Sequence, residues 1–430
     1  MQDTRRSAAM RVAAGAAVCA MVVTGASRTA TAPGGTWGTA QEVPGTAALN
    51  SGGSALVISV SCPSAGNCAA GGAYTDSSRS EQAFVASEVN GTWHAAIEVP
   101  GTAALNQGGQ AQVYQVSCAS AGNCSAGGFY LDSSGRDQAY VAGELNGTWH
   151  AAIEVPGTAA LNSGGSAAVI SVSCASAGNC SAGGSYTDSS GHAQAFVAGE
   201  TNGTWGAAQE VPGTAALNSG GEAVVSSVSC ASAGNCAAGG YYVDSSGHAQ
   251  AFVANEKNGT WHAAIEVPGT AALNQGGRAG VGLGSVSCAS AGNCAIGGFY
   301  TDSVGAGQAF VASEVNGTWH AAIEVPGTAA LNQRAAAGAG SVSCASAGNC
   351  AVGGSYADSS GHRQVFVAGE VNGTWQTAVE VPGTAALNQG GRAGFFSVSC
   401  APAGNCAAGG FYTDSSRHEQ AFVVNKPSSH

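Results

Sequence analysis

The chain has 430 residues, of which 67 are glycine and only 9% are charged, and its formal net charge is −12. A hydrophobic share of 44% excludes an intrinsically disordered chain, because such chains are poor in apolar residues and rich in charge. The acidic balance excludes a general binder of nucleic acids or anionic membranes, since those partners select for lysine and arginine.

Residues 1–32 have the pattern of an export signal. An arginine pair, Arg5 and Arg6, opens a basic start, and a mostly apolar run follows at residues 12–26. We expect cleavage after Ala32, with Ala26 as the alternative, and export by the general or the twin-arginine route. No later segment has the roughly 18 apolar residues that span a bilayer. The sequence therefore predicts a secreted protein, and its two lysines against eleven arginines favour a bacterial source.

Tryptophan marks an internal repeat that covers the rest of the chain. The tryptophans recur at intervals of about 56 residues, with one slightly longer interval, as Trp37, Trp93, Trp149, Trp205, Trp261, Trp319 and Trp375. Each leads into Glu-Val-Pro-Gly-Thr-Ala-Ala-Leu-Asn, and an apolar run, two cysteines and Gly-Gly-x-Tyr-x-Asp follow. Residues 33–430 are therefore predicted to form one domain of seven similar units.

Each unit predicts four short strands. In the first complete unit they span residues 56–62, 68–75, 82–89 and 92–99. The fourth alternates, so that Trp93, Ile97 and Val99 are expected on one face and His94 on the other. Asn90-Gly91 suits a two-residue hairpin turn, because both residues tolerate a positive φ. No stretch keeps an apolar period of 3.6 residues, so little helix is expected.

Four antiparallel strands repeated seven times predict an all-β fold, a seven-bladed β-propeller of four-stranded blades. The mature chain begins with a fourth strand alone, at residues 36–43. It ends with three strands alone, at residues 395–400, 406–412 and 420–424. Pairing the N-terminal strand with the C-terminal three would complete the seventh blade and close the propeller. An open solenoid is the alternative, but it would require capping repeats.

The Gly-Gly pair, the tyrosine two residues later and the tryptophan about twenty residues beyond resemble the kelch type of propeller repeat. In the first complete unit these residues are Gly71, Gly72, Tyr74 and Trp93, and in the next they are Gly127, Gly128, Tyr130 and Trp149. The chain lacks the basic residue that usually follows the kelch tryptophan segment, and its paired cysteines are additional. The resemblance implies a propeller that serves as a binding scaffold, and it implies no active site.

Fourteen cysteines form seven pairs with five intervening residues, each around the turn between the first two strands of a unit. The pairs are Cys62/Cys68, Cys118/Cys124, Cys174/Cys180, Cys230/Cys236, Cys288/Cys294, Cys344/Cys350 and Cys400/Cys406. In an exported chain we expect structural disulfides, with Cα atoms about 5.5 Å apart across the hairpin. Metal binding or a redox role is the alternative, but no pair has the further ligands of a zinc site. Cys19 lies in the export signal.

Two carboxylate series repeat in every unit. One precedes Val-Pro: Glu42, Glu98, Glu154, Glu210, Glu266, Glu324 and Glu380. The other opens the loop after the second strand: Asp76, Asp132, Asp188, Asp244, Asp302, Asp358 and Asp414. A residue present in every unit serves the unit, so both are interpreted as structural. Calcium binding and paired-carboxylate hydrolysis are the alternatives, and we expect no metal or cofactor.

The one charge cluster that breaks the repeat is basic. Arg278 and Arg392 lie five residues after the leucine of their connections, and Arg334 lies two places earlier in its unit. These positions open the innermost strands, on the face that carries the aspartate loops and the long connections. Guanidinium groups from neighbouring blades could hold a carboxylate bidentately, so we predict a ligand site for an acidic sugar. Pairing with acids such as Glu222, or plain exposure, is the alternative.

The predicted function is extracellular binding of a glycan, a cell-wall polymer or a protein by a monomeric propeller, with seven similar loops that permit multivalent contact. A hydrolase or lyase that acts on polysaccharide is the alternative, and a purely structural surface protein is a third interpretation. The arginine set is similar to the carboxylate-binding arginines of sialidases. However, sialidases have six blades and a Ser-x-Asp-x-Gly-x-Thr-Trp box that this chain lacks, so no catalytic residue is assigned.

Overall fold

The computed structural model describes residues 41–401 and 405–426. The predicted export signal and nearly all of the strand expected at residues 36–43 lie outside the described residues. The blades belong to one compact unit, Val43–His430. No helix in the described part of the chain is long and apolar enough to cross a membrane.

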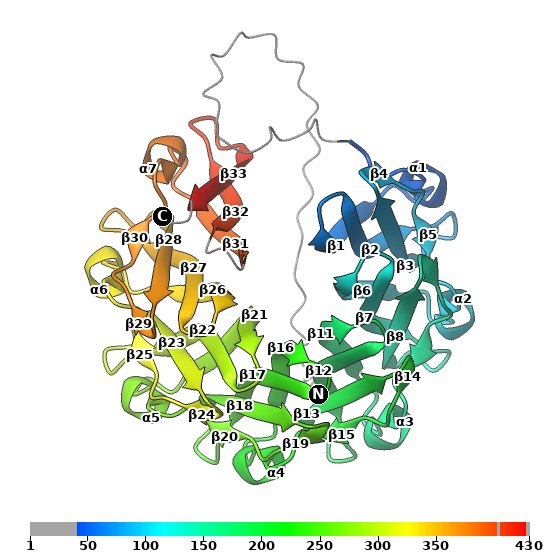
Figure 1. The fold of residues 1–430 in the computed structure, drawn as a ribbon, viewed down its shortest axis with the longest axis horizontal. Coiled ribbons are helices and arrows are strands. Elements are labelled where there is room, and N and C mark those ends of the chain that lie inside the picture. The colour runs from blue at the N-terminus through cyan, green and yellow to red at the C-terminus, as the bar shows by residue number, and fades with distance from the viewer. Residues whose placement is uncertain (1–40, 402–404, 427–430) are drawn as a thin grey trace, which may run out of the picture. The chain divides into compact units, whose positions relative to one another are not determined.

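The described residues form seven antiparallel sheets, which follow one another in chain order (Figure 1). Blade 1 comprises β1 (Ala55–Ser64), β2 (Asn67–Thr75), β3 (Glu81–Val89), β4 (Thr92–Trp93) and β5 (Ile97–Glu98). Blade 2 comprises β6 (Ala111–Ser120), β7 (Asn123–Leu131), β8 (Asp137–Leu145), β9 (Thr148–Trp149) and β10 (Ile153–Glu154). Blade 3 comprises β11 (Ala167–Ser176), β12 (Asn179–Thr187), β13 (Ala193–Thr201), β14 (Thr204–Trp205) and β15 (Gln209–Glu210).

Blades 4 to 7 repeat this order. Blade 4 comprises β16 (Ala223–Ser232), β17 (Asn235–Val243), β18 (Ala249–Lys257), β19 (Thr260–Trp261) and β20 (Ile265–Glu266). Blade 5 comprises β21 (Ala279–Ser290), β22 (Asn293–Thr301), β23 (Gly307–Val315), β24 (Thr318–Trp319) and β25 (Ile323–Glu324). Blade 6 comprises β26 (Gly338–Ser346), β27 (Asn349–Ala357), β28 (Arg363–Val371), β29 (Thr374–Trp375) and β30 (Val379–Glu380). Blade 7 comprises β31 (Ala393–Cys400), β32 (Cys406–Thr413) and β33 (Glu419–Lys426). The prediction of a seven-bladed β-propeller is confirmed.

The fourth strand of blades 1 to 6 differs from the prediction, because it is interrupted. In blade 1 the expected strand becomes β4 and β5, with residues 94–96 outside any strand. The amide of Ala96 donates to the carbonyl of Pro44 at 2.6 Å, so this residue bonds to the preceding connection rather than to its own sheet. Consequently Ala96 is buried at 6% exposure and Ile97 is 43% exposed, and the predicted alternation was wrong.

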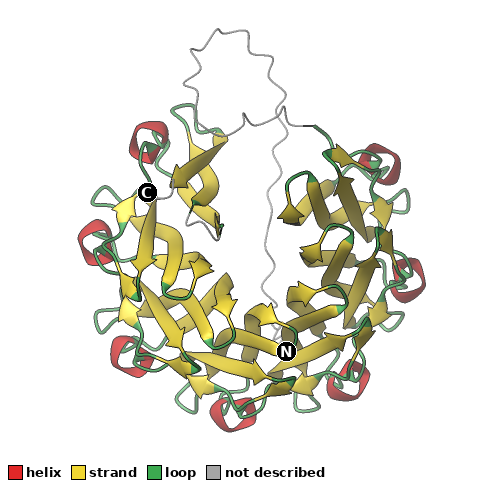
Figure 2. Ribbon diagram, in the orientation of Figure 1, coloured by secondary structure: helices red, strands yellow, loops and turns green. Residues whose placement is uncertain are grey.

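Each long connection contains a one-turn helix that the sequence pattern did not predict. The described helices are α1 (Thr46–Leu49), α2 (Thr102–Leu105), α3 (Thr158–Leu161), α4 (Thr214–Leu217), α5 (Thr270–Leu273), α6 (Thr328–Leu331) and α7 (Thr384–Leu387). They lie at the outer ends of the sheets (Figure 2). Gly101, with φ +83°, precedes α2, and a Cβ there would lie 3.2 Å from Ala151 Cβ. Glycine is therefore required by both conformation and space.

The core lies in the seams between successive blades, and the Gly-Gly pair makes it possible. A Cβ on Gly71 would lie 2.6 Å from Val113 and 2.7 Å from Val116, which are side chains of the next blade's inner strand β6. A Cβ on Gly72 would lie 1.9 Å from the Leu56 carbonyl oxygen within its own blade. Val113 is fully buried as a result. The glycines that carry the kelch resemblance are thus positions where neighbouring chain occupies the side-chain space.

All seven predicted disulfides are present, namely Cys62–Cys68, Cys118–Cys124, Cys174–Cys180, Cys230–Cys236, Cys288–Cys294, Cys344–Cys350 and Cys400–Cys406. Their Cα–Cα distances are 3.9–4.0 Å, shorter than the expected spacing of about 5.5 Å. The register explains the difference, since Cys174 pairs directly with Cys180 next to an irregularity at Ser176. Closely spaced pairs of an antiparallel ladder lie about 4.5 Å apart rather than about 5.5 Å.

The position of the cysteines also corrects the predicted hairpin. The sequence placed the end of the first strand at Cys62 and the start of the second at Cys68. In the structure β1 continues to Ser64 and β2 begins at Asn67, so both cysteines lie inside the ladder and only residues 65–66 form the turn. The same extension occurs in blades 2 to 6, whereas β31 ends at Cys400 and β32 begins at Cys406, as predicted.

The second cysteine of a pair is a core residue as well as half of a disulfide. Five of these cysteines are 5–6% exposed and pack in the seam with the preceding blade: Cys124, Cys180, Cys236, Cys294 and Cys350. Cys68 of blade 1 is only partly buried, because no blade precedes it in the described part of the chain. The cysteine pairs therefore contribute to the packing between blades as well as to the hairpin.

Hydrogen bonds confirm the predicted faces of the loops. At one end of blade 1, the Asn90-Gly91 turn meets the cysteine turn, where the Gly91 amide donates to the Gly66 carbonyl at 2.7 Å. At the other end, the loop after α1 meets the aspartate loop, where the Gly52 amide donates to the Thr75 carbonyl at 2.8 Å. We call these the cysteine face and the aspartate face.

Candidate functional site

The glutamates before Val-Pro stabilise their own blades. Tyr74 Oη donates to Glu98 Oε2 at 3.2 Å, and Thr102 Oγ1 donates to Glu98 Oε1 at 3.2 Å. The same pair of bonds recurs at Glu154, Glu210, Glu266, Glu324 and Glu380. Burial and the neighbouring Glu98 carboxylate raise the pKa of Tyr74. These groups join the second strand, the fourth strand and the following helix, and they leave no free carboxylate pair for hydrolysis among these described glutamates.

The aspartates close their loops. Asp76 Oδ2 accepts a bond from Gln82 Nε2 at 2.9 Å, and Oδ1 accepts from the amides of Ser78 and Ser80 at 2.8 and 3.0 Å. The Gln82 bond, helped by the two amides, lowers the pKa of Asp76. The described residues contain no group of three or more metal-ligating side chains. The aspartate oxygens are therefore already used within the loop.

The side chains that differ between blades meet at a backbone bridge on the aspartate face. A parallel bridge joins the start of one blade's third strand to the residue before the next blade's inner strand. The bridged pairs are Glu81 with Gln110, Asp137 with Ser166, Ala193 with Glu222, Ala249 with Arg278, Gly307 with Ala336, and Arg363 with Arg392. We call these twelve residues the bridge positions. They bring charges from two blades together at a seam.

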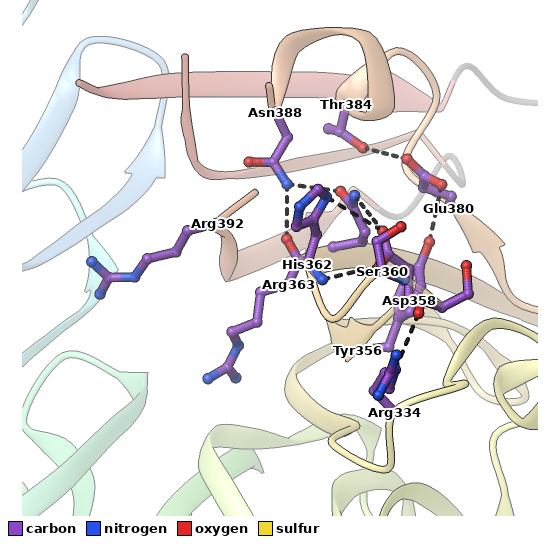
Figure 3. A network of polar contacts seen from close by, with 12 residues as sticks. Arg334, Tyr356, Asp358, Ser360, His362, Arg363, Glu380, Thr384, Asn388 and Arg392 are labelled. Atoms are coloured by element: carbon purple, nitrogen blue, oxygen red, sulfur yellow. Dashed lines mark hydrogen bonds and ion pairs between the residues drawn. The ribbon is translucent and has the colours of Figure 1, made fainter. Parts of the chain in front are cut away.

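The three predicted arginines do not form one set. Arg278 and Arg392 occupy bridge positions and are exposed. In blade 6 the bridge position belongs to Ala336, and Arg334 Nε instead donates to the Ser359 carbonyl at 3.1 Å, on the aspartate loop of its own blade (Figure 3). The sequence set is thus divided between the bridge positions and an outer loop.

The structure places a further arginine, Arg363, beside Arg392, because a backbone bridge joins the two residues. Arg392 Nη1 lies 2.9 Å from Glu419 Oε1, and its guanidinium lies 5.4 Å from the centre of the Phe411 ring. Arg363 Nη2 donates to Ser355 Oγ at 2.9 Å. Both side chains project away from the network around Asp358 (Figure 3).

Two guanidinium groups against one carboxylate leave this seam positively charged. Among the described blades, only blade 6 begins its third strand with a basic residue, Arg363. Comparison of the repeats could have detected this signal in the sequence.

Aromatic rings lie on the second strands, opposite the first residues of the inner strands. The residue after Gly-Gly is Phe299 in blade 5 and Phe411 in blade 7, and each is paired with a glycine of the inner strand, Gly280 and Gly394. Phe299 is 40% exposed, whereas Phe129, which is paired with Gln112, is 7% exposed. Phe411 is partly buried, and the Arg392 guanidinium lies over its ring. Blades 5 and 7 thus share an arginine, a glycine and a phenylalanine opposite it, a combination that we call the Arg–Gly–Phe unit.

One tyrosine–glutamate contact also breaks the repeat. Tyr241 Oη donates to Glu222 Oε1 at 2.6 Å. Burial, the hydrogen bond and the Glu222 charge all raise the pKa of Tyr241. Glu222 therefore pairs with a tyrosine and not with an arginine.

No family model and no curated protein matches the sequence. Among solved structures, the propeller domain of the Trilobed protease from Pyrococcus furiosus is similar at 7% identity and a TM-score of 0.44, and the match covers 87% of this chain and 98% of that one. A polysaccharide lyase, an ulvan lyase, matches at 10% identity and a TM-score of 0.45, with coverage of 84% and 90%. A Trypanosoma rangeli sialidase in complex with sialic acid matches at 11% identity and a TM-score of 0.40, with coverage of 86% of this chain and 54% of that one.

Matches at such low identity and TM-score carry no argument about activity, and the class of protein rests on the chain's own sheets. The described residues define a seven-bladed β-propeller with one disulfide in each blade.

Proposed function

We propose that this protein is a secreted binding module that recognises an anionic glycan through the Arg–Gly–Phe units of blades 5 and 7 together with Arg363, which is bridged to Arg392. The carrying observation is the seam between blades 6 and 7, where Arg363 and Arg392 are joined by a backbone bridge and Phe411 lies under Arg392. Nearly everything else in the blades repeats, so these side chains are the ones that can distinguish a ligand.

The chemistry of the units suits a sugar acid. A guanidinium fork matches a carboxylate or sulfate with two parallel hydrogen bonds. An exposed ring such as Phe299 offers a flat apolar surface, and binding sites combine such surfaces with a few placed polar groups. Glu81, Asp137 and Glu222 make the bridge positions of the first four blades acidic. That charge distribution favours one orientation of an anionic polymer across the aspartate face.

Secretion and the binding role have independent support. Fourteen half-cystines in disulfides are typical of proteins from oxidising compartments. The glycine, tyrosine and tryptophan positions support a kelch-like repeat, which serves mainly as a binding scaffold.

The test is a calorimetric titration of the mature protein with polygalacturonate at several salt concentrations. Dextran serves as the neutral polymer. We expect binding of polygalacturonate only, and weaker binding as salt rises. Arg363→Ala and Arg392→Ala should each weaken binding about tenfold or more, because each removes a charge-assisted pair worth about 1.5–3 kcal/mol. Arg334→Ala is the matched control, since this arginine is exposed in the connection between α6 and β26, away from the bridge positions. It should leave the affinity unchanged.

Equal affinity of the wild type, Arg363→Ala and Arg392→Ala for polygalacturonate would contradict the proposal. Release of unsaturated or reducing ends from the polymer would instead assign the protein to the alternative class, the polysaccharide hydrolases and lyases.

A further inference from the structure

The seams on the cysteine face contain a repeated chain of hydrogen bonds. Between blades 1 and 2, Trp149 Nε1 donates to Ser87 Oγ at 3.0 Å, and Ser87 Oγ donates to Glu144 Oε1 at 2.7 Å. Trp375, Ser313 and Glu370 make the same chain between blades 5 and 6, at 3.0 and 2.7 Å. Between blades 4 and 5, Asn255 takes the place of the serine, between Trp319 and Glu314. In each of these seams a donor–acceptor group bridges an indole and a carboxylate.

Two seams with the same indole and carboxylate lack the bridging side chain. Between blades 3 and 4 the bridging position is Gly199, and Glu256 is held at its other oxygen, Oε2, by Ser181 Oγ at 3.3 Å. Trp261 Nε1 then has no hydrogen-bond partner among the described residues. The equivalent residues between blades 2 and 3 are Gly143, Ser125, Glu200 and Trp205. We call these two the glycine seams.

The residue paired with the bridging position on the neighbouring second strand differs between the two kinds of seam. Where the bridging serine or asparagine is present, the position of Ser181 is alanine: Ala69, Ala237 and Ala295. In the glycine seams a serine stands there instead and holds the glutamate from the other side. The carboxylate is therefore kept in place, while its Oε1 side is left open.

One glycine seam contains a cleft. Between blades 3 and 4, a cleft of about 370 Å³ is lined by Gly199, Glu256 and Trp261, among others. A cleft between blades 5 and 6, which is lined by Ser313 and Trp375 and not by Glu370, measures about 200 Å³. Glu256 is 8% and Trp261 is 6% exposed, so both side chains are buried apart from the part that faces the cleft. Hydrogen bonds in such a partly shielded place are stronger than in open water.

We propose that the two glycine seams bind a hydroxyl group of a polyol or neutral sugar, which takes the place of the serine hydroxyl. The ligand atom must accept from Trp261 Nε1 and donate to Glu256 Oε1, and a hydroxyl oxygen, of an alcohol or of water, does both at one atom. An ammonium group cannot accept, and a carboxylate cannot donate and would be repelled by Glu256. The larger cleft lies within the size range of small-ligand sites.

This site is separate from the proposed anionic-glycan site. The cleft is lined by Ala233 and Gly234 of the cysteine turn and by Asn258 and Gly259 of the Asn-Gly turn. These turns lie on the cysteine face, whereas the arginines lie on the aspartate face. Either site can therefore fail without the other.

The test is a titration of the full mature protein with glucose and with glycerol, in which NMR measures the chemical shifts of the indole N–H groups. We expect saturable shifts for Trp205 and Trp261 only. Gly199→Ser supplies the missing hydroxyl, so the Trp261 shift should disappear while the Trp205 shift remains. The double variant Ser313→Gly with Ala295→Ser recreates the glycine seam between blades 5 and 6, and Trp375 should then gain a saturable shift.

The controls separate this proposal from loss of folding and from the other site. Gly199→Ser must keep the wild-type unfolding transition, and Arg392→Ala must leave the sugar-induced shifts unchanged. Shifts that stay linear in both ligands, in wild type and variants alike, would mean that the clefts hold only water and would overturn the proposal. Equal shifts in all seams would overturn it too.

Discussion

At the residue scale, glutamates at one strand position are nearly excluded from water. Glu144, Glu200, Glu256, Glu314 and Glu370 are 2–8% exposed, and burial raises the pKa of each. The bond from Ser87 to Glu144, and its counterparts in the other seams, offsets only part of this effect. No cation accompanies these carboxylates among the hydrogen bonds and ion pairs of the described residues. They therefore make stability depend on pH.

These glutamates predict a loss of stability toward neutral pH. A carboxyl whose pKa is raised in the folded state binds its proton more tightly there, so its contribution is complete below the ordinary value of 4.5 and is lost as pH rises through the folded pKa. The loop aspartates act in the opposite sense, because their lowered pKa makes their contribution disappear as pH falls through the folded value. We expect urea unfolding to show greatest stability on the acidic side of neutrality.

Glu370→Gln isolates this effect, because Glu370 Oε2 is buried without a hydrogen-bond partner among the described residues. We expect the variant to be more stable than wild type by about 1 kcal/mol at pH 7 and not at pH 4, the order of a buried polar group's desolvation cost. An equal gain at both pH values would contradict the explanation.

At the element scale, the second glycine of the Gly-Gly pair permits the inner strand to approach. A Cβ on Gly240 would lie 1.8 Å from the Val224 carbonyl oxygen, and backbone cannot yield as a flexible side chain can. Gly240→Ala should therefore destabilise the protein by about 3 kcal/mol, the upper end of the overpacking range. Gly206→Ala is the control, since its nearest atom would be Gly199 O at 3.4 Å. Equal decreases in the thermal unfolding midpoint of both variants would contradict this role.

Each disulfide stabilises mainly its own hairpin. Cys230 and Cys236 join β16 to β17 across a separation of six residues. The loop-entropy relation gives about 2 kcal/mol for so short a loop. We expect Cys230→Ala with Cys236→Ala to lose about that amount in urea unfolding, with the fold retained, since alanine leaves no polar group at the buried Cys236. Complete unfolding of the double variant would show that this disulfide contributes more than its hairpin.

At the scale of the whole molecule, the first and last blades each expose apolar side chains whose equivalents in other blades are buried. Val57 and Val60 of β1 are 43% and 55% exposed, whereas their equivalents Val113 and Val116 are 0% and 3% exposed. On the other side, Val423 of β33 is 55% exposed. Closure of the propeller would bury all of these groups.

Polar side chains of blades 1 and 7 are also complementary. Asn425 of blade 7 is the equivalent of Asn255, and Glu88 and Trp93 of blade 1 are the equivalents of Glu314 and Trp319. We therefore predict that Asn425 bridges Trp93 and Glu88 in the closed propeller. A double-mutant cycle of Asn425→Ala and Glu88→Gln should give a coupling energy of about 0.5–3 kcal/mol, the range of contacting pairs.

The double-mutant cycle of Asn255→Ala and Glu314→Gln is the matched control for closure, because the seam between blades 4 and 5 already contains this contact.

Sedimentation should show a monomer at all concentrations. A dimer would mean that a second copy covers the faces of blades 1 and 7.

The repeat made most of the fold predictable. Strand order, the cysteine pairs and the two loop faces follow from patterns within a single unit, where local turn chemistry and hydrophobic alternation act. The interruption at Ala96 did not follow, because its bond partner Pro44 belongs to the connection of a different unit. The one-turn helices were missed for a related reason, since so few residues cannot show a helical period. Burial of Cys124 and its equivalents also depends on a neighbouring blade.

The sequence by itself determined the class of fold, because the same local pattern recurs in every unit. It also showed that Arg278 and Arg392 break the repeat, but not what lies beside them. Only the tertiary structure decided that Arg363 stands next to Arg392 and that Trp261 faces a space where Trp375 meets Ser313. These neighbours come from different blades, and the physical contact that joins them is the packing of one sheet against the next.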